Sequence, residues 1–301
     1  MPSKREKKRK VQSNKVRLTH FTNTRIRQII GWGAVALGIV IISFSVLIAL
    51  EPSWIRSIPY IGKAFAYAET VIKGPKLPDT AGLYGIDVSK HQGNIHWDEV
   101  ELRYDMVTRR ISKHGTMQAP LTFAIAKATE GITTTDPMFE LNKKGIRERN
   151  IILGAYHYFS YLSDAKKQAE KYLQVAKLAK GDLVPIIDIE EDGNLIKLLK
   201  NKKLTKQKVK ENVLLWLRTA EEKTKAKPII YTSPSYKAEY LDSPEFDKYT
   251  LWIAHYQVSE PKLKGAMWQF TERGAIKGIS TNVDINLFCG TKTDLQQLMI
   301  K

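Results

Sequence analysis

Two carboxylates close an apolar run in the middle of the chain. Residues 183–190 read Leu-Val-Pro-Ile-Ile-Asp-Ile-Glu, so Asp188 and Glu190 stand two positions apart. Side chains two apart on an extended strand point to the same side, roughly 6.5 Å apart along the chain. Because burying one charge beside another is costly, we expect one acid to keep its proton near neutral pH. Glycoside hydrolysis typically uses such a pair, one protonated carboxyl group and one ionised carboxylate.

The apolar run that carries this pair predicts a strand buried on both faces, as in a parallel sheet. Pro185 is compatible with that prediction because it lies near the start of the strand. A second interpretation remains open at this point. Glu190, Glu191 and Asp192 also form an acidic cluster of the kind that opens a helix or binds surface cations.

Eight segments rich in β-branched and aromatic residues predict strands, and helical spacing separates several of them. The predicted strands are residues 84–89, 123–129, 151–160, 183–190, 228–233, 250–256, 266–270 and 283–288, with helices around 139–150, 165–178 and 205–225. This pattern favours an α/β fold, an irregular (β/α)₈ barrel that is least regular toward its C-terminus. A doubly wound open sheet is the alternative, although the glycine-rich phosphate loop that it often carries is missing.

Carboxylates, amides and aromatic rings gather where these strands end. In a barrel of this type the carboxyl ends of the strands meet at the edge where the chemistry takes place. Aromatic faces stack on pyranose rings, while carboxylates and amides bind sugar hydroxyls, so this mixture suits a carbohydrate cleft. The residues concerned are Asp87, Lys127, Tyr156, Asp188, Glu190, Trp252, Tyr256, Trp268, Gln269 and Asp284.

Seven motifs at these strand ends occur in an order that resembles one enzyme family. They are Asp87-Val-Ser-Lys-His-Gln-Gly93, Lys127-Ala-Thr-Glu-Gly131, Gly154-Ala-Tyr-His-Tyr-Phe159, Asp188-Ile-Glu190, Trp252-Ile-Ala-His-Tyr256, Trp268-Gln-Phe270 and Asn282-Val-Asp-Ile-Asn286. Together they resemble the motifs of the family 25 glycoside hydrolases, lysozymes of the N-acetylmuramidase type. The resemblance covers about residues 82–290.

The resemblance implies hydrolysis of the β-1,4 bond between N-acetylmuramic acid and N-acetylglucosamine in peptidoglycan, without a metal or an organic cofactor. It implies that Glu190 is the general acid and that Asp188 steadies the substrate's own 2-acetamido group during its attack, with net retention. Asp87 and Asp284 resemble the flanking acids of the cleft. Substrate contacts are expected from Tyr156, Lys127, Trp268, Gln269, Gln92, Trp252 and Tyr256.

The chain also departs from the family pattern. The gap between Gly93 and Lys127 is long and carries a charged insert around residues 103–118. Thr134 stands where the family usually has an aromatic residue or leucine, and Ala126 replaces a larger apolar residue. These differences affect the expected substrate range more than they affect the acids.

The first fifty residues predict a membrane anchor. Residues 1–28 hold ten Lys/Arg and one acid, and the 22 residues 29–50 carry no charge. A helix of that length spans roughly 33 Å, enough to cross the hydrocarbon core of a bilayer. The positive-inside rule keeps residues 1–28 in the cytoplasm and sends the rest of the chain across the cytoplasmic (inner) membrane. A cleavable signal peptide is the main alternative, but the apolar run is longer than usual and no cleavage site follows it closely.

We therefore expect a cytoplasmic tail (1–28), a transmembrane helix (29–50), a juxtamembrane linker (51–81) and a hydrolase domain (82–301). The formal charge of +17 is concentrated in the tail beside the apolar run, which favours membrane over nucleic acid as a partner. The expected partners are peptidoglycan strands and, through residues 29–50, the lipid bilayer, with the protein a monomer. Two alternative functions remain: another barrel glycosidase such as a chitinase, and a non-catalytic wall-binding scaffold.

Overall fold

The computed structural model describes residues 73–261 and 265–301. The predicted cytoplasmic tail, the predicted transmembrane helix and most of the predicted linker lie outside the described residues. Across the described ranges, no helix has the length and apolar character needed to cross a membrane.

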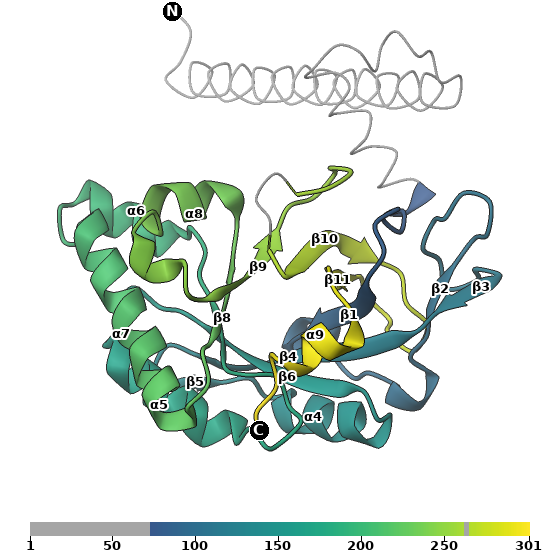
Figure 1. Cartoon of the computed structure of the whole chain (residues 1–301), viewed down its shortest axis with the longest axis horizontal. Helices are drawn as coiled ribbons and strands as arrows, with labels where there is room; N and C mark the ends of the chain where they lie inside the picture. The colour runs from purple at the N-terminus through teal and green to yellow at the C-terminus, as the bar shows by residue number, and fades with distance from the viewer. Residues whose placement is uncertain (1–72, 262–264) are drawn as a thin grey trace, which may run out of the picture. The chain divides into compact units, whose positions relative to one another are not determined.

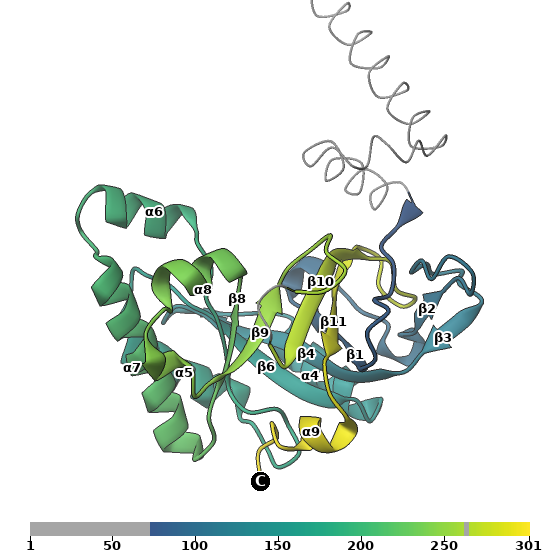
Figure 2. The same cartoon turned by 45° about the horizontal axis from the view of Figure 1, so that its top comes forward.

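Eight strands close into a barrel (Figures 1 and 2), because β1 pairs with both β4 and β11. Neighbouring strands are parallel except at β11, which runs antiparallel to β1 and β10. The predicted irregular barrel is confirmed, and the open doubly wound sheet is wrong because the sheet has no free edge between β1 and β4. The strands are β1 (Leu83–Val88), β4 (Leu121–Glu130), β6 (Ile152–Tyr158), β7 (Ile186–Asp188), β8 (Ile229–Thr232), β9 (Thr250–Ala254), β10 (Met267–Gly274) and β11 (Val283–Phe288).

Helices pack outside the early part of the barrel. The three predicted helices are present as α4 (Phe139–Glu148), α5 (Ala165–Ala176) and α7 (Lys206–Thr224). The helical spacing of apolar residues in α7 predicts its buried face correctly, since Val209, Val213 and Trp216 are all buried. Three short helices, α6 (Gly193–Lys200), α8 (Pro234–Tyr240) and α9 (Lys292–Gln296), were not predicted.

Side chains alternate along each strand between the barrel interior and the helix layer. On β4, Phe123 and Ile125 belong to the interior cluster, whereas Ala124 and Ala126 belong to the outer cluster under the helices. Burying both faces of a strand explains its nearly continuous apolar sequence.

The C-terminal segment closes the barrel at the amino ends of the parallel strands. Leu295 of α9 is fully buried in the interior cluster. After this helix, the Val184 N–H donates to the Leu298 carbonyl at 2.9 Å, and the Ile300 N–H donates to the Asp182 carbonyl at 2.8 Å. This edge is therefore filled with apolar side chains, while the opposite edge remains hollow.

The charged insert forms an additional hairpin, which the sequence did not predict. Strands β2 (Leu102–Tyr104) and β3 (Met117–Ala119) pair antiparallel beside the barrel. The short strand β5 (Thr134–Thr135) pairs with the end of β4. Three 3₁₀ turns complete the described secondary structure, η1 (Lys90–Gln92), η2 (Trp97–Glu99) and η3 (Pro244–Phe246).

Candidate active site

A cavity of about 250 Å³ lies at the carboxyl ends of the parallel strands. Nine of the eleven residues predicted for the site line it, and only Gln92 and Trp268 do not. The lining residues are Asp87, His91, Lys127, Tyr156, Tyr158, Asp188, Glu190, Tyr231, Trp252, Tyr256, Gln269, Glu272 and Asp284. The cavity thus contains five carboxylates and four tyrosines, from strands and loops between Asp87 and Asp284.

Asp188 and Glu190 face this cavity from the same strand end. Asp188 is the last residue of β7 and pairs in register with Tyr158 on β6 and Tyr231 on β8. Glu190 follows, and its carbonyl accepts a hydrogen bond from the Tyr161 hydroxyl at 2.7 Å. Both carboxylates line the cavity, as the spacing of two residues predicts.

The helix-capping interpretation applies to a different member of the acidic cluster. Asp192 is the N-cap of α6, and its carboxylate accepts the Leu195 N–H at 2.7 Å. Glu190 is not needed for that cap. The acids of this segment therefore have two different roles. Asp188 and Glu190 face the cavity, whereas Asp192 caps α6.

Burial favours the protonated forms of both Asp188 and Glu190. Burial raises the pKa of Asp188 well above its ordinary value, and the nearby charge of Glu190 raises it further. Burial also raises the pKa of Glu190, although a hydrogen bond with Tyr231 opposes that shift. Asp188 is only 8% exposed, and its buried Oδ1 has no hydrogen-bond partner among the described residues. The pair is thus arranged to share a proton and to accept a donor from outside the protein.

Asp87 and Asp284 form a second pair across the site. They are register neighbours on β1 and β11, and Asp284 reaches the carboxyl edge because β11 is antiparallel. The Asp87 Oδ2 accepts 2.8 Å hydrogen bonds from the side-chain amides of Gln269 and Asn286. Burial and then the Asp87 charge raise the pKa of Asp284 to about 9. Asp284 therefore keeps its proton at neutral pH. Burial also raises the pKa of Asp87, and the hydrogen bonds from Asn286 and Gln269 oppose that shift.

Lys127 forms an ion pair and also lines the cavity. Its Nζ donates to Glu130 Oε2 at 2.7 Å and lies 4.7 Å from the centre of the Tyr158 ring. It also lines the cavity, and its positive charge lowers the pKa of Asp188 against the larger effect of burial. The ammonium is thus held by Glu130 while its charge still acts on Asp188.

Trp268 and Gln92 lie outside the cavity and support its frame. Trp268 is 2% exposed and belongs to the outer cluster, because Gln269 next to it occupies the inward position on β10. Its indole N–H donates to the His255 carbonyl at 2.7 Å. Gln92 accepts the Ser89 N–H at 2.9 Å and donates to the Asn282 carbonyl at 3.1 Å, joining the loop after β1 to the start of β11.

Four lining residues were not among the predicted site residues. His91 and Tyr158 lie inside two of the seven motifs, so their position in a motif could have identified them as site residues. Tyr231 is the third of the four residues of β8, whose sequence matched no motif. Glu272 was missed because β10 continues to Gly274, four residues past its predicted end.

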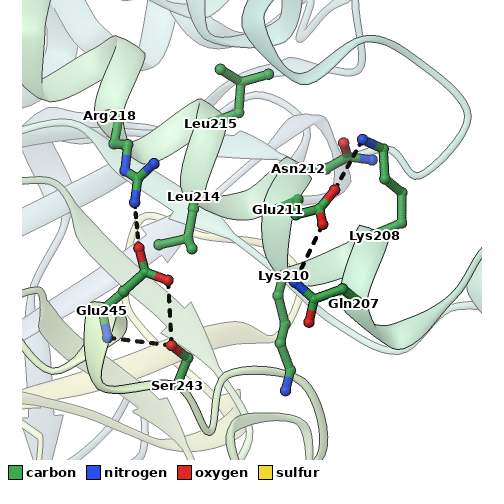
Figure 3. Close-up of a pocket in the computed structure, with 10 residues that line it drawn as sticks. All are labelled: Gln207, Lys208, Lys210, Glu211, Asn212, Leu214, Leu215, Arg218, Ser243 and Glu245. Carbon is green, nitrogen blue, oxygen red and sulfur yellow. Dashed lines mark hydrogen bonds and ion pairs between the residues drawn. The ribbon is translucent and has the colours of Figure 1, made fainter.

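A second hollow of about 600 Å³ lies between α7 and the segment around η3 (Figure 3). Its charged side chains are largely paired with one another. Arg218 pairs with Glu245, and the Lys208 Nζ lies 3.1 Å from Glu211 Oε2. These pairs are partly exposed, with side chains about half accessible to solvent. The hollow therefore has none of the desolvated carboxylates that distinguish the cavity at the barrel edge.

Comparison with known proteins agrees with this geometry. The model of glycosyl hydrolases family 25 matches residues 86–279. The uncharacterised protein YegX of Escherichia coli is 35% identical over 224 residues, which covers 73% of this chain and 75% of that protein. Lysozyme M1 of Streptomyces globisporus is 28% identical over 237 residues, 73% of this chain and 72% of that protein.

Solved structures share the barrel. The bacterial lysozyme from Streptomyces coelicolor superposes with a TM-score of 0.61 at 26% identity, covering 73% of this chain and 98% of that one. A family 25 glycosyl hydrolase from Bacillus anthracis has the same fold, with a TM-score of 0.60 at 24% identity over 75% of this chain and 96% of that one. The chain belongs to glycosyl hydrolase family 25 and is a glycoside hydrolase.

Proposed function

We propose that this glycoside hydrolase is an N-acetylmuramidase, a lysozyme that cuts the β-1,4 bond between N-acetylmuramic acid and N-acetylglucosamine in bacterial peptidoglycan. The observation that carries the proposal is the pair Asp188 and Glu190, which face one cavity with Asp87 and Asp284. The similarity to Lysozyme M1 and to the Streptomyces coelicolor lysozyme supports the choice of substrate.

Glu190 is the general acid in this mechanism. Burial raises its pKa and so favours the protonated form, which supplies the proton that the departing sugar oxygen must receive. After the bond breaks, the ionised Glu190 takes a proton from the attacking water. A group that first gives and then takes a proton works best when its pKa lies near the working pH, and burial moves Glu190 in that direction.

Asp188 supports the substrate's own acetamido group. Its buried Oδ1 lacks a hydrogen-bond partner among the described residues, and the N–H of an acetamido group would satisfy it. The raised pKa makes ionised Asp188 a stronger acceptor for that proton as the acetamido oxygen attacks the anomeric carbon. Two displacements at one carbon give net retention. Two neighbouring carboxyls on one strand end, instead of two facing ones, suit this assisted route.

The other polar groups of the cavity fix the flanking sugar positions. Asp87 is oriented by Gln269 and Asn286, so it presents a fixed acceptor to sugar hydroxyls. The rings of Tyr156 and Tyr256 and the indole of Trp252 supply apolar surface in the same cavity. This combination of rigid acceptors and aromatic rings is what a glycan strand requires.

The cellular setting of the proposal follows from the sequence of residues 1–50. We place the enzyme in the cytoplasmic (inner) membrane as a single-pass monomer, with residues 1–28 in the cytoplasm and the barrel on the outer side, where peptidoglycan is found. A tethered enzyme of this kind acts on the wall next to its own membrane.

A digest of defined peptidoglycan by the full-length protein in detergent tests the proposed function. Mass spectrometry is expected to find new reducing ends on N-acetylmuramic acid, and NMR of the first products is expected to find the β-anomer. New reducing ends on N-acetylglucosamine, or cleavage of chitin oligomers at a comparable rate, would favour the chitinase alternative. Binding to peptidoglycan without any released fragment would favour the non-catalytic scaffold.

A further inference from the structure

The insert of residues 101–119 presents apolar side chains to solvent. Met106 and Val107, at the tip of the β2–β3 hairpin, are 69% and 89% exposed. Behind them, Met117 is 38% exposed and is the register partner of the half-buried Tyr104. Three of the eight large apolar side chains that are exposed in the described part of the chain thus lie on this one hairpin.

The hairpin tip is an ordered turn. Asp105 Oδ1 accepts hydrogen bonds from the Val107 N–H at 3.1 Å, the Thr108 N–H at 2.8 Å and the Thr108 hydroxyl at 2.8 Å. These bonds fix the backbone that carries Met106 and Val107. A turn that is held in place while its largest apolar side chains stay in solvent is a surface suited to a partner.

The insert also binds the segment by which the chain enters the barrel domain. The Leu77 N–H donates to the Arg109 carbonyl at 2.9 Å, and the Ile111 N–H donates to the Pro75 carbonyl at 2.8 Å. The Arg109 guanidinium donates to the Pro78 carbonyl at 2.7 Å. Residues 73–79 are therefore held beside the hairpin, at the end of the domain away from α5 and α7 (Figures 1 and 2).

The insert and the segment beside it carry a net positive charge. Residues 73–79 and 101–119 hold six Lys/Arg against three acids. A hairpin tip with exposed methionine and valine, a tyrosine behind it and a basic surround matches the requirements of an anionic bilayer surface. At such a surface the apolar side chains would enter the interfacial layer. Arg103 pairs with Glu101 and Arg109 with Asp79, so the attraction to anionic headgroups comes from the net charge of the two segments.

We propose that the 101–119 hairpin docks the barrel on the outer surface of the anionic membrane that carries its anchor. This inference rests on the anchor in the proposed function. Only 22 residues separate the end of the predicted transmembrane helix at Leu50 from Lys73, so the tether reaches at most about 80 Å. The second contact is therefore intramolecular, and a weak affinity of the hairpin is sufficient to hold the domain down.

Site-specific fluorescence in lipid nanodiscs tests the docking. The full-length protein carries Val107→Cys in a Cys289→Ser background, which removes the single native cysteine, and a polarity-sensitive dye is attached. With brominated anionic lipid we expect about twofold quenching and a blue shift, both reduced by high salt. The matched control is Ile196→Cys on α6, which is 52% exposed and is expected to show neither change.

Equal quenching of the dye at positions 107 and 196 would overturn the docking proposal. Fluorescence at position 107 that does not change with the anionic lipid would overturn it as well. If Met106→Ser with Val107→Ser instead weakens retention on insoluble peptidoglycan, the hairpin binds the wall and not the membrane. Failure of the anchor is recognised separately, because the protein would then elute apart from the discs. In that case the same labelled protein is titrated with anionic vesicles, and an unchanged emission there overturns the docking as well.

Discussion

The two edges of the barrel use the same strands for opposite purposes. At the amino edge, Leu183 and Val184 pack with Leu295 in a filled apolar cluster. At the carboxyl edge, the interior positions of the same sheet hold the acids of the cavity. On β7 the change takes two residues, from the fully buried Ile186 to Asp188. The apolar packing at the amino edge therefore offsets the cost of burying ionisable groups at the carboxyl edge.

The two edges affect the stability of the folded state in different ways. Buried acids with raised pKa values lower the stability of the folded state once the pH is high enough to ionise them. Apolar side chains at the amino edge stabilise the fold at any pH. Variants at the carboxyl edge should therefore change activity more than stability, and variants at the amino edge should do the reverse.

The largest effect is expected from Glu190→Gln. Loss of a general acid removes about 10²–10⁴-fold from kcat, while the isosteric amide leaves the barrel folded. The measurement is the release of soluble glycan fragments from peptidoglycan, with circular dichroism to confirm the fold. The neighbouring exposed Glu191→Gln is the matched control and should retain activity. A loss of less than tenfold in Glu190→Gln would exclude it as the acid.

At the amino edge, Leu295→Ala should destabilise the protein by about 2–5 kcal/mol, because it opens a cavity under the barrel. Leu295 is fully buried, whereas Leu141 is 58% exposed, so Leu141→Ala is the control with little expected change. Urea unfolding of both variants gives the difference. At low temperature, where both variants are folded, kcat should remain that of the parent. A lower kcat in folded Leu295→Ala would mean that the two edges are coupled.

The regular parts of the barrel were predictable because the sequence displays them locally. Each of the eight predicted strands corresponds to a strand of the barrel, and the apolar spacing in α7 matches its buried face. The two-residue spacing of Asp188 and Glu190 likewise placed both on one face. The spacing of apolar residues is sufficient to predict these elements. A strand buried on both faces has a continuous apolar sequence, and a helix buried on one face has apolar residues every three or four positions.

Other features depend on contacts between distant segments. Trp268 belongs to one of the seven motifs, but the register of β10 places its side chain outside the barrel. The Gln269 side chain lines the cavity instead. Tyr231 reaches the cavity from a strand without a motif. The strands of the β2–β3 hairpin have only three residues each, too few to show a clear alternation. None of these placements follows from a window of neighbouring residues.

A smaller effect, which depends on pH, is expected from Asp284→Asn. The Asp284 pKa rises from 3.8 in the unfolded chain to about 9 in the folded state, so the folded state binds more protons between these values. Stability from this group is present below pH 3.8 and is lost as the pH rises toward 9.

The asparagine variant has no such proton to lose. Its Tm should therefore match the parent near pH 4 and exceed it near pH 8, where each kcal/mol corresponds to about 2–4 °C. Thermal unfolding at the two pH values is the measurement, with the exposed Asp98→Asn as control. An equal difference at both pH values would mean that folding does not raise the pKa of Asp284.

The smallest effect separates two tryptophans on neighbouring strands. The Trp252 indole N–H donates to Asn286 Oδ1 at 2.8 Å, and the Asn286 amide donates to Asp87. Trp252→Phe breaks the first link of this chain, so Asp87 loses its fixed orientation. We expect kcat/KM to fall by about tenfold or less, since one neutral hydrogen bond contributes about 0.5–1.5 kcal/mol.

Trp268→Phe provides the matched comparison. Both indoles are 2% exposed and both donate one hydrogen bond, but Trp268 lies in the outer cluster and bonds the His255 carbonyl. The two phenylalanine variants should therefore lose similar stability, while only Trp252→Phe changes kcat/KM. Steady-state kinetics with a soluble glycan, beside urea unfolding of both variants, measures the two quantities. If both variants lowered kcat/KM equally, general loosening of the barrel, and not the link to Asp87, would account for the loss.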